Sequence, residues 1–221
     1  MHDVAPPRFT PLVELPRRRL FGFAVEQAGP SAARFATALG VLGGWARDTA
    51  PVVMIDLTCA EVSATATAAA LEAITAARVR PEALMVRVPR FEPGGSTACL
   101  DRLADAGIGV AVSDLDLVGA IPGALAGAPI DLIELPADAV ALVEQHPDAA
   151  SYLRDLISLA HSHDWMTLAA SVVTRGQLEV LERLGCDLIA GPAAGPAMTL
   201  EQATRVVTRQ RPSDSAPAPA I

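Results

Sequence analysis

Short apolar runs recur along most of the chain, and polar or alanine-rich segments separate them. The first two runs, FTPLVEL at residues 9–15 and LFGFAVE at 20–26, flank the turn sequence PRRR and predict a β-hairpin. The next run, VVMIDL at 52–57, is continuously apolar, as is typical of a parallel strand that is buried on both faces. Similar runs predict further strands at 84–88, 108–113, 131–135, 166–171 and 187–190.

The segments between the strands carry signals for helices. Ser31 is a candidate N-cap for a helix whose apolar positions run from Phe35 to Trp45 with helical spacing. Gly107 and Gly185 follow two further predicted helices, and glycine readily adopts the left-handed conformation that ends a helix. The remaining pattern predicts helices at 63–78, 97–106, 137–144, 148–162, 175–184 and 199–209, and a short one that ends at Gly127.

An opening hairpin followed by alternating strands and helices predicts an α/β fold, and about seven strands in the parallel series favour a TIM-like (β/α) barrel. A doubly wound open sheet is the alternative, although no GxGxxG motif opens a helix after the first strand. We expect one barrel domain at 9–209, a flexible leader at 1–8 and a disordered tail rich in proline and alanine at 210–221.

Composition excludes several classes of enzyme. The chain contains neither lysine nor asparagine, so all 17 basic residues are arginines. Without lysine the protein cannot form a Schiff base with a substrate or supply the lysine of a P-loop. A GC-rich genome would explain this composition, but the chemical consequence is the same.

Charge and cysteine usage bear on partners and compartment. The net charge of −8 argues against nucleic acid as a partner. We recognise neither a signal peptide nor an apolar stretch long enough to span a membrane, so we expect a cytoplasmic protein without a membrane partner. Cys59, Cys99 and Cys186 are far apart in sequence, which we interpret as three buried thiols rather than a disulfide or a zinc site.

Two further segments could bind a metal ion or an anion, but each also has a simpler structural interpretation. His161 and His163 have the H-x-H spacing of some metal sites, but they follow a predicted helix, where histidine interacts well with the last carbonyls. The segment GPAAGPA at 191–197 could bind an anion at a barrel mouth, and a plain turn rich in proline and glycine is the simpler interpretation.

A barrel places its chemistry at the carboxyl ends of its strands. Asp56, Asp114 and Asp116 could meet there around one hard cation, although separate solvated or helix-capping carboxylates are the simpler interpretation. Arg87 could instead neutralise Asp56 or Asp114 by a bidentate pair. The predicted strand-end positions are Ala24, Asp56, Arg87, Ser113, Asp114, Glu134, Ala170 and Ala190.

The order of these segments resembles the EAL domain, the cyclic-di-GMP phosphodiesterase barrel, from the hairpin to about residue 198. The hairpin is similar to the family's QPIVDL…GxEALxR segment, VVMIDLT to its VNLS strand, and PEALMVRVPR to PxxLxLEITE. Further on, LADAGIGVAVSDLDLVG resembles LxxxGxxIALDDFGTG, and APIDLIELP resembles LPxDxIKID. The longest match is LAASVVTRGQLEVLERLGCDLIAGP, which is similar to xAEGVETxxQLxxLxxLGCDxxQGY. The resemblance implies an EAL-type barrel in which the hairpin contributes one antiparallel strand.

The same resemblance implies that the catalytic residues have been replaced. The family uses carboxylates, an asparagine and a lysine around two divalent metals that activate water against a phosphodiester. Here Ala24 stands for the glutamate of the EAL motif, Asp56 for the asparagine and Glu134 for the lysine. Arg87 and Arg90 stand for two further glutamates.

The remaining family positions are also changed. Ser113 stands for the first of two paired aspartates, and only the second survives, as Asp114. Ala170 stands for the glutamate of AEGVE, and Ala190 for the glutamine of QGY. One retained aspartate beside an intruding arginine does not supply the several anionic ligands that two such metals need.

The resemblance therefore implies a catalytically inactive EAL-like domain, without catalytic residues, metal or cofactor, that acts as a regulatory or protein-interaction module in cyclic-di-GMP-related signalling. The implied partner is an unidentified regulatory protein. One alternative is a sensor that binds cyclic-di-GMP without cleaving it, with Arg87, Arg90 and Asp114 as candidate ligand-binding residues. A residual metal-dependent phosphodiesterase is a second alternative. The apolar segment 115–127 further suggests a homodimer.

Overall fold

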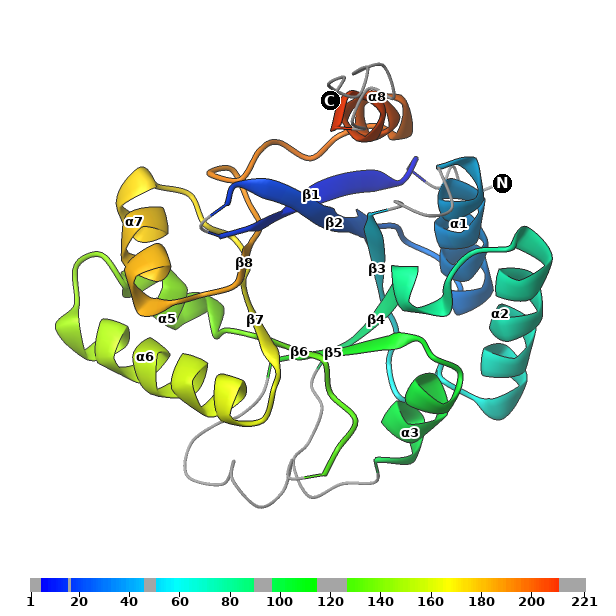
Figure 1. Ribbon diagram of the computed structural model, residues 1–221, viewed down its shortest axis with the longest axis horizontal. Coiled ribbons are helices and arrows are strands. Elements are labelled where there is room, and N and C mark those ends of the chain that lie inside the picture. The colour runs from blue at the N-terminus through cyan, green and yellow to red at the C-terminus, as the bar shows by residue number, and fades with distance from the viewer. Residues whose placement is uncertain (1–4, 16, 46–50, 90–96, 115–126, 211–221) are drawn as a thin grey trace, which may run out of the picture.

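Eight strands close into a barrel and follow one another around the ring in chain order (Figure 1). The computed structural model describes residues 5–15, 17–45, 51–89, 97–114 and 127–210. The helices lie outside the ring, and α8 (Leu200–Gln210) lies beyond the hairpin. The closed ring confirms the predicted TIM-like (β/α) barrel and excludes the open doubly wound sheet.

The hairpin closes the barrel. β1 (Arg8–Glu14) is antiparallel to both of its neighbours, β2 (Arg19–Glu26) and β8 (Leu188–Ile189), whereas all other neighbouring pairs are parallel. Gly22 allows β2 to approach the next strand closely, because a Cβ there would lie 2.2 Å from the carbonyl oxygen of Val52. The other strands are β3 (Val52–Asp56), β4 (Leu84–Pro89), β5 (Gly109–Ser113), β6 (Leu132–Glu134) and β7 (Met166–Ala169).

The helices lie close to their predicted positions. α7 (Arg175–Leu184) has both of its predicted bounds; a capping box between Thr174 and Gln177 begins it, and Gly185 at φ 84° ends it. The other helices that precede α8 are α1 (Ser31–Gly44), α2 (Ala64–Ala77), the 3-10 turn η1 (Pro81–Ala83), α3 (Ala98–Asp105), α5 (Ala137–Leu142) and α6 (Pro147–Ser162).

One predicted cap is wrong. Ser31 is the first residue of α1, and Pro30 occupies the N-cap position without a side-chain hydrogen bond. Proline serves here because its extended backbone orients its carbonyl group toward the helix, and that carbonyl accepts hydrogen bonds from the amides of Ala33 and Arg34. The short helix predicted before Gly127 and the tail from 211 onward lie outside the described residues, as do residues 1–4 of the predicted leader.

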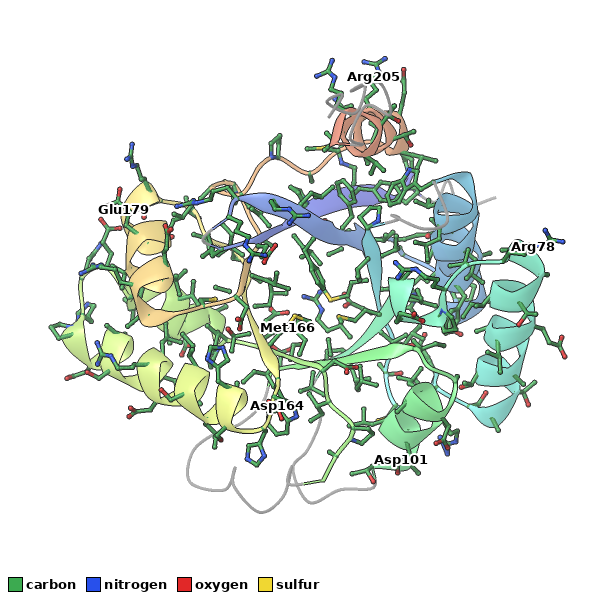
Figure 2. The ribbon with its side chains drawn as sticks, in the orientation of Figure 1. Arg78, Asp101, Asp164, Met166, Glu179 and Arg205 are labelled. Atoms are coloured by element: carbon green, nitrogen blue, oxygen red, sulfur yellow. A yellow bond between two sulfur atoms is a disulfide. The ribbon has the colours of Figure 1, made fainter. Side chains whose placement is uncertain are left out.

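Side chains alternate between the inside and the outside of the barrel. The inner layer is apolar and consists of Leu12, Met54, Met85, Ala111, Leu132, Leu168, Leu188 and Ala190. A larger cluster fills the space between strands and helices and includes Val53, Val86 and Val112. Burial on both faces explains the continuous apolar runs in the sequence. Charged side chains such as Arg78, Glu179 and Arg205 point away from the barrel (Figure 2).

The cysteine prediction is wrong for two of the three residues. Cys59 and Cys99 form a disulfide, with their Cα atoms 5.4 Å apart, between the segment that follows β3 and the first turn of α3. Cys59 is exposed and Cys99 is buried. Adjacent strands bring these two segments together, although 40 positions separate the two cysteines in the chain. Cys186 is buried, as predicted.

None of the helices in the described residues is both long enough and apolar enough to cross a membrane.

Candidate functional site

A cavity of about 650 Å³ opens at the carboxyl end of the barrel. Its lining includes the residues at the ends of several strands, among them the last residue of β3 and the residues that follow β7 and β8. Six of the eight strand-end positions predicted from the sequence meet there: Ala24, Asp56, Arg87, Glu134, Ala170 and Ala190.

The two-residue repeat of the strands explains this meeting. Met54 and Met85 belong to the inner apolar layer, so Asp56 and Arg87, two residues further on, point into the same interior. Leu132 and Glu134 are related in the same way on β6. Part of the apolar layer therefore forms the floor of the cavity, and the charged side chains lie two residues further along their strands, closer to its opening.

Arg87 connects two acidic residues across the cavity. It lies beside Asp56 in the parallel register of β3 and β4, and its Nε and Nη2 atoms donate to Asp56 Oδ1 and Oδ2 over 2.6 and 2.9 Å. Its Nη1 atom donates to Glu134 Oε2 on β6. The predicted bidentate pair with Asp56 is confirmed, and the additional bond to Glu134 was not predicted. All three nitrogens of the Arg87 guanidinium thus donate hydrogen bonds to two carboxylates.

Burial and pairing set the charges of this triad. Burial alone would lower the pKa of Arg87, but the hydrogen bonds that it donates to Asp56 and the charges of Glu134 and Asp56 outweigh this effect and raise the pKa. Arg87 therefore stays cationic. Burial raises the pKa of Glu134 above its usual range, because desolvation of the carboxylate outweighs the attraction of Arg87. Asp56 and Asp114 add to this effect through their negative charges.

The EAL domain family model matches residues 2–197. The chain belongs to the EAL domain family. No curated protein sequence matches it. Among solved structures, the EAL domain of Mycobacterium smegmatis DcpA superposes with a TM-score of 0.80 at 15% identity, over 94% of this chain and 99% of that one. The PaMucR phosphodiesterase in complex with c-di-GMP gives a TM-score of 0.70 at 17% identity, over 89% and 93% of the two chains.

The EAL enzyme Bd1971, solved in its cAMP-bound form, gives a TM-score of 0.79 at 13% identity. That match covers 93% of this chain but only 66% of Bd1971, so the chain spans about two thirds of the length of that relative. At these identities, the likeness to solved structures shows the barrel and its topology, and the chemistry of the site has to be argued from this chain's own residues.

The two divalent metals that the EAL family implies do not fit this cavity. Both oxygens of Asp56 accept hydrogen bonds from Arg87, so this carboxylate is already neutralised. The guanidinium also places a permanent positive charge at the position where the resemblance implies a ligand glutamate. Within the described residues, no three His, Cys, Asp or Glu side chains come together as a metal site would require.

The two remaining predicted site residues lie beside the cavity. Ser113 ends β5 and is buried, and Asp114 follows it with an exposed side chain and a φ of 52°. Neither residue is among those that line the cavity, although the charge of Asp114 still acts on Glu134. Arg90 and Asp116, which the sequence also suggested, lie outside the described residues, as does nearly all of the segment 115–127.

The rim of the cavity contains residues that the sequence did not single out. Thr10 on β1 donates its hydroxyl to Glu26 at the end of β2 over 2.6 Å, and both residues line the cavity. The segment 191–197 crosses the same rim as a turn, as its proline and glycine content predicts. Gly191 has a φ of 108°, and a Cβ there would lie 2.7 Å from the amide nitrogen of Val172, so the turn requires glycine.

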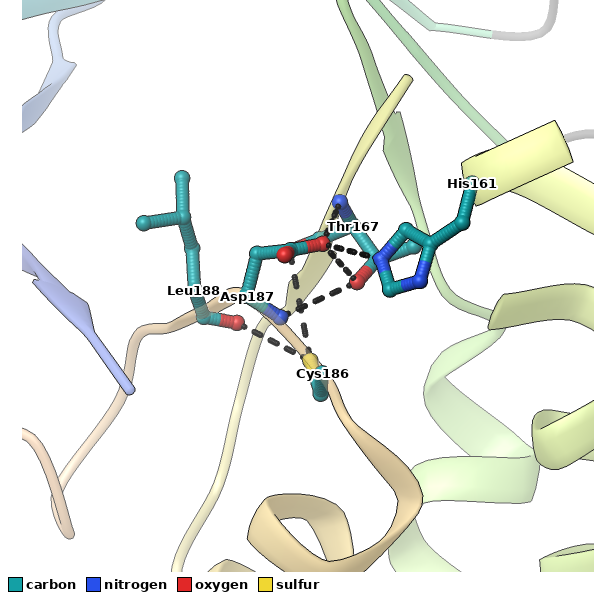
Figure 3. Close-up of polar contacts among 5 residues, drawn as sticks. All are labelled: His161, Thr167, Cys186, Asp187 and Leu188. Carbon is teal, nitrogen blue, oxygen red and sulfur yellow. Dashed lines mark hydrogen bonds and ion pairs between the residues drawn. The ribbon is translucent and has the colours of Figure 1, made fainter. Parts of the chain in front are cut away.

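The GCD segment (residues 185–187), which is part of the longest sequence match, has a structural role. Asp187 accepts hydrogen bonds through Oδ2 from the amide and the hydroxyl of Thr167, and the same oxygen lies 2.9 Å from His161 Nε2 (Figure 3). Thr167 Oγ1 in turn accepts from the Asp187 amide. His161 thus directs its ring toward Asp187, and the ring of His163 stacks on Trp165. These contacts fix β8 to β7 and lie outside the cavity.

Proposed function

We propose that this EAL domain is catalytically inactive and acts as a regulatory or protein-interaction module in cyclic-di-GMP-related signalling. The observation that carries the proposal is the position of Arg87, whose guanidinium is held between Asp56 and Glu134 inside the cavity of the barrel. A metal site that had lost only one of its ligands would still bind a metal ion, with lower affinity. An arginine bound by two carboxylates instead replaces the cations that such a site would hold.

Hydrolysis by the mechanism that the family resemblance implies needs two divalent metals and several anionic ligands. Three of the positions that the resemblance assigns to such chemistry are now alanines, Ala24, Ala170 and Ala190, and alanine offers no atom to a metal or a water molecule. A fourth, Glu134, is an acid where the family has a lysine, so the charge that would face a phosphate is reversed. These residues support a retained scaffold without the original chemistry.

A sensor of cyclic-di-GMP is the second function to consider, because PaMucR was solved in complex with c-di-GMP. The volume of the cavity would suit a ligand of moderate size. However, Arg87 is the only cation among the described residues of the lining, and three of its five N–H donors already serve Asp56 and Glu134. A dinucleotide would bring two phosphates into a cavity that also contains Glu26, so repulsion favours the protein-interaction role.

The direct test is an assay for hydrolysis of cyclic-di-GMP in Mg²⁺ and in Mn²⁺, with the PaMucR phosphodiesterase as the positive control. We expect no linear dinucleotide or GMP above the level of a blank without protein. Product that accumulates in proportion to the amount of this protein, and that disappears on addition of EDTA, would contradict the proposal.

Titration calorimetry with cyclic-di-GMP, with and without Mg²⁺, separates the two candidate functions. We expect no saturable heat, and a saturable one would favour the sensor. The homodimer and the cytoplasmic location stay predictions from the sequence. Light scattering at several protein concentrations tests the first, and fractionation of cells tests the second.

A further inference from the structure

The cavity at the barrel mouth has apolar walls beneath a charged rim. Leu12, Met54 and Leu168 form its floor, and all three are almost completely buried. Val173 lies at its edge with 60% of its surface exposed. This is the highest value among the exposed large apolar residues in the described part of the chain. A ligand that fills this cavity therefore needs an apolar part, and groups on either side of that part can contact Val173 at the edge of the cavity.

The charges of the lining do not balance. Among the described residues, the lining contains three acids, Glu26, Asp56 and Glu134, and a single base, Arg87. The charge of Asp114 adds to the negative field around Glu134. A concave site with apolar walls concentrates such a field, so it attracts cations and repels phosphates.

The carboxylates also have acceptor capacity left. An ionised carboxylate can accept about four hydrogen bonds. Within the described part of the chain, Glu26 accepts one, from Thr10 at Oε1, and Glu134 accepts one, from Arg87 at Oε2. No described residue donates a hydrogen bond to Glu26 Oε2 or to Glu134 Oε1, so these two oxygens can accept from a ligand.

The cavity suits an organic cation better than a metal ion. No three donor side chains of the described residues converge as a metal site needs. Arg87, in contrast, demonstrates in the same cavity that these acids bind a guanidinium. An arginine or lysine side chain carries its charge on an apolar stem, and this stem matches walls of leucine, methionine and alanine.

We propose that the mouth of the barrel binds a basic side chain of a partner protein, an arginine or a lysine flanked by apolar residues. This inference rests on the proposed function, because it gives the chemistry of the partner that a protein-interaction module would recognise. Charge complementarity and the apolar walls select this occupant over a dinucleotide, whose two phosphates the acids would repel.

The test uses the full chain labelled with ¹⁵N and a capped tripeptide with an arginine between two leucines. The matched probe has citrulline in place of arginine, which keeps the shape of the side chain and removes the charge. We expect saturable chemical-shift changes around the cavity and an affinity about fivefold higher for the arginine peptide, as partly exposed opposite charges provide. Equal affinity for the two peptides, or no saturable change with either, would overturn the inference.

Variants locate the binding. Glu26→Gln removes an exposed rim charge at little risk to folding, and we expect it to weaken binding of the arginine peptide about two- to threefold while binding of the citrulline peptide is unchanged. Glu179→Gln, on an exposed face of α7, is the control and should leave both affinities as in the wild type. Weakening by Glu179→Gln equal to that by Glu26→Gln would place the peptide elsewhere and overturn the inference.

The assay of hydrolysis keeps the two proposals apart. If cyclic-di-GMP is not hydrolysed and the arginine peptide does not bind, only the present inference fails. If cyclic-di-GMP is hydrolysed, the proposed function fails, whatever the peptides do. A competition experiment compares the affinities of cyclic-di-GMP and the arginine peptide for the cavity. If cyclic-di-GMP displaces the peptide and binds more tightly than the peptide does, the cavity prefers an anion and the inference is overturned.

Discussion

Asp56 and Arg87 lie side by side on neighbouring parallel strands, and two hydrogen bonds of 2.6 and 2.9 Å join the carboxylate to the guanidinium. The side chain of Arg87 is 20% exposed and that of Asp56 44%. The register of β3 and β4 alone brings the two residues together, and the third bond, to Glu134, extends the contact across the barrel. This EAL barrel thus has an internal cation among the residues that line its cavity.

Removal of Arg87 should destabilise the barrel, because Asp56 and Glu134 would then face each other as unpaired negative charges. We expect Arg87→Ala to lower the free energy of unfolding by about 2–3 kcal/mol, less than for a fully buried pair because Asp56 is partly solvated. Urea unfolding followed by circular dichroism measures the change.

The control for this experiment is Arg175→Ala. Arg175 pairs with Glu179 on the surface of α7, and its side chain is 91% exposed. Such a pair contributes only about 0.3–0.5 kcal/mol. If Arg87→Ala destabilised the protein no more than Arg175→Ala does, the ion pairs of the cavity would contribute no more to the stability of the fold than an exposed pair.

Glu134 should give the protein a measurable dependence of stability on pH. Burial raises its pKa in the folded state, so the folded protein binds this proton more tightly than the unfolded chain does. The resulting stabilisation is complete below the unfolded pKa of about 4.3 and is lost as pH rises through the folded pKa. Glu134→Gln cannot titrate, so the wild type minus variant difference in unfolding free energy should fall between pH 4 and pH 7.

Urea unfolding of both proteins at several pH values between these limits checks the sign. All other titratable residues are common to the two proteins, so the difference between the curves reports Glu134 together with its coupling to Arg87, Asp56 and Asp114. A difference that increases with pH would mean that Arg87 lowers the pKa of Glu134 more than burial raises it.

The barrel could be predicted because its local signals agree with one another. α7 illustrates this, since it has the predicted bounds and Gly185 ends it in the structure as the sequence predicts. The apolar runs of the strands reflect burial on both faces, which only a sheet covered by helices provides. The predicted parallel direction of the strands also placed Asp56 and Arg87 at the same end of the barrel.

What the sequence could not supply is contact between segments that no local rule connects. The bond from Arg87 to Glu134 crosses from β4 to β6 and depends on the curvature of the closed ring. The disulfide between Cys59 and Cys99 depends on how two neighbouring loops lie against each other. Spacing in the sequence carries no information about either contact.

The disulfide makes stability dependent on the redox conditions. A bridge that closes a loop of 40 positions removes chain entropy from the unfolded state worth about 4 kcal/mol in the loop-closure model. We expect reduction, or Cys99→Ser, to lower the melting temperature, and Cys186→Ala to leave the effect of reduction in place. Thiol titration in denaturant should find one thiol before reduction and three afterwards. Three thiols in the unreduced protein would contradict the bridge.

Asp187 should contribute to stability through the contact between β7 and β8, independently of the cavity. Its Oδ2 atom accepts from the amide and hydroxyl of Thr167, which is fully buried, and a lost acceptor would leave these donors unsatisfied. We expect Asp187→Ala to lower the free energy of unfolding by about 2–3 kcal/mol and Asp187→Asn by about 1–2 kcal/mol, since the amide oxygen is a weaker acceptor.

Asp155→Asn is the matched control, because Asp155 is exposed on α6 and no side-chain hydrogen bond joins it to the other described residues. Surface changes of this kind stay within about 0.5 kcal/mol. Thr167→Val should reproduce part of the Asp187→Asn effect, and the double variant should lose less than the sum of the two, because both changes act on the same bond between Thr167 Oγ1 and Asp187 Oδ2. Additive losses would show that Thr167 and Asp187 act separately, and that the GCD segment stabilises the barrel by another route.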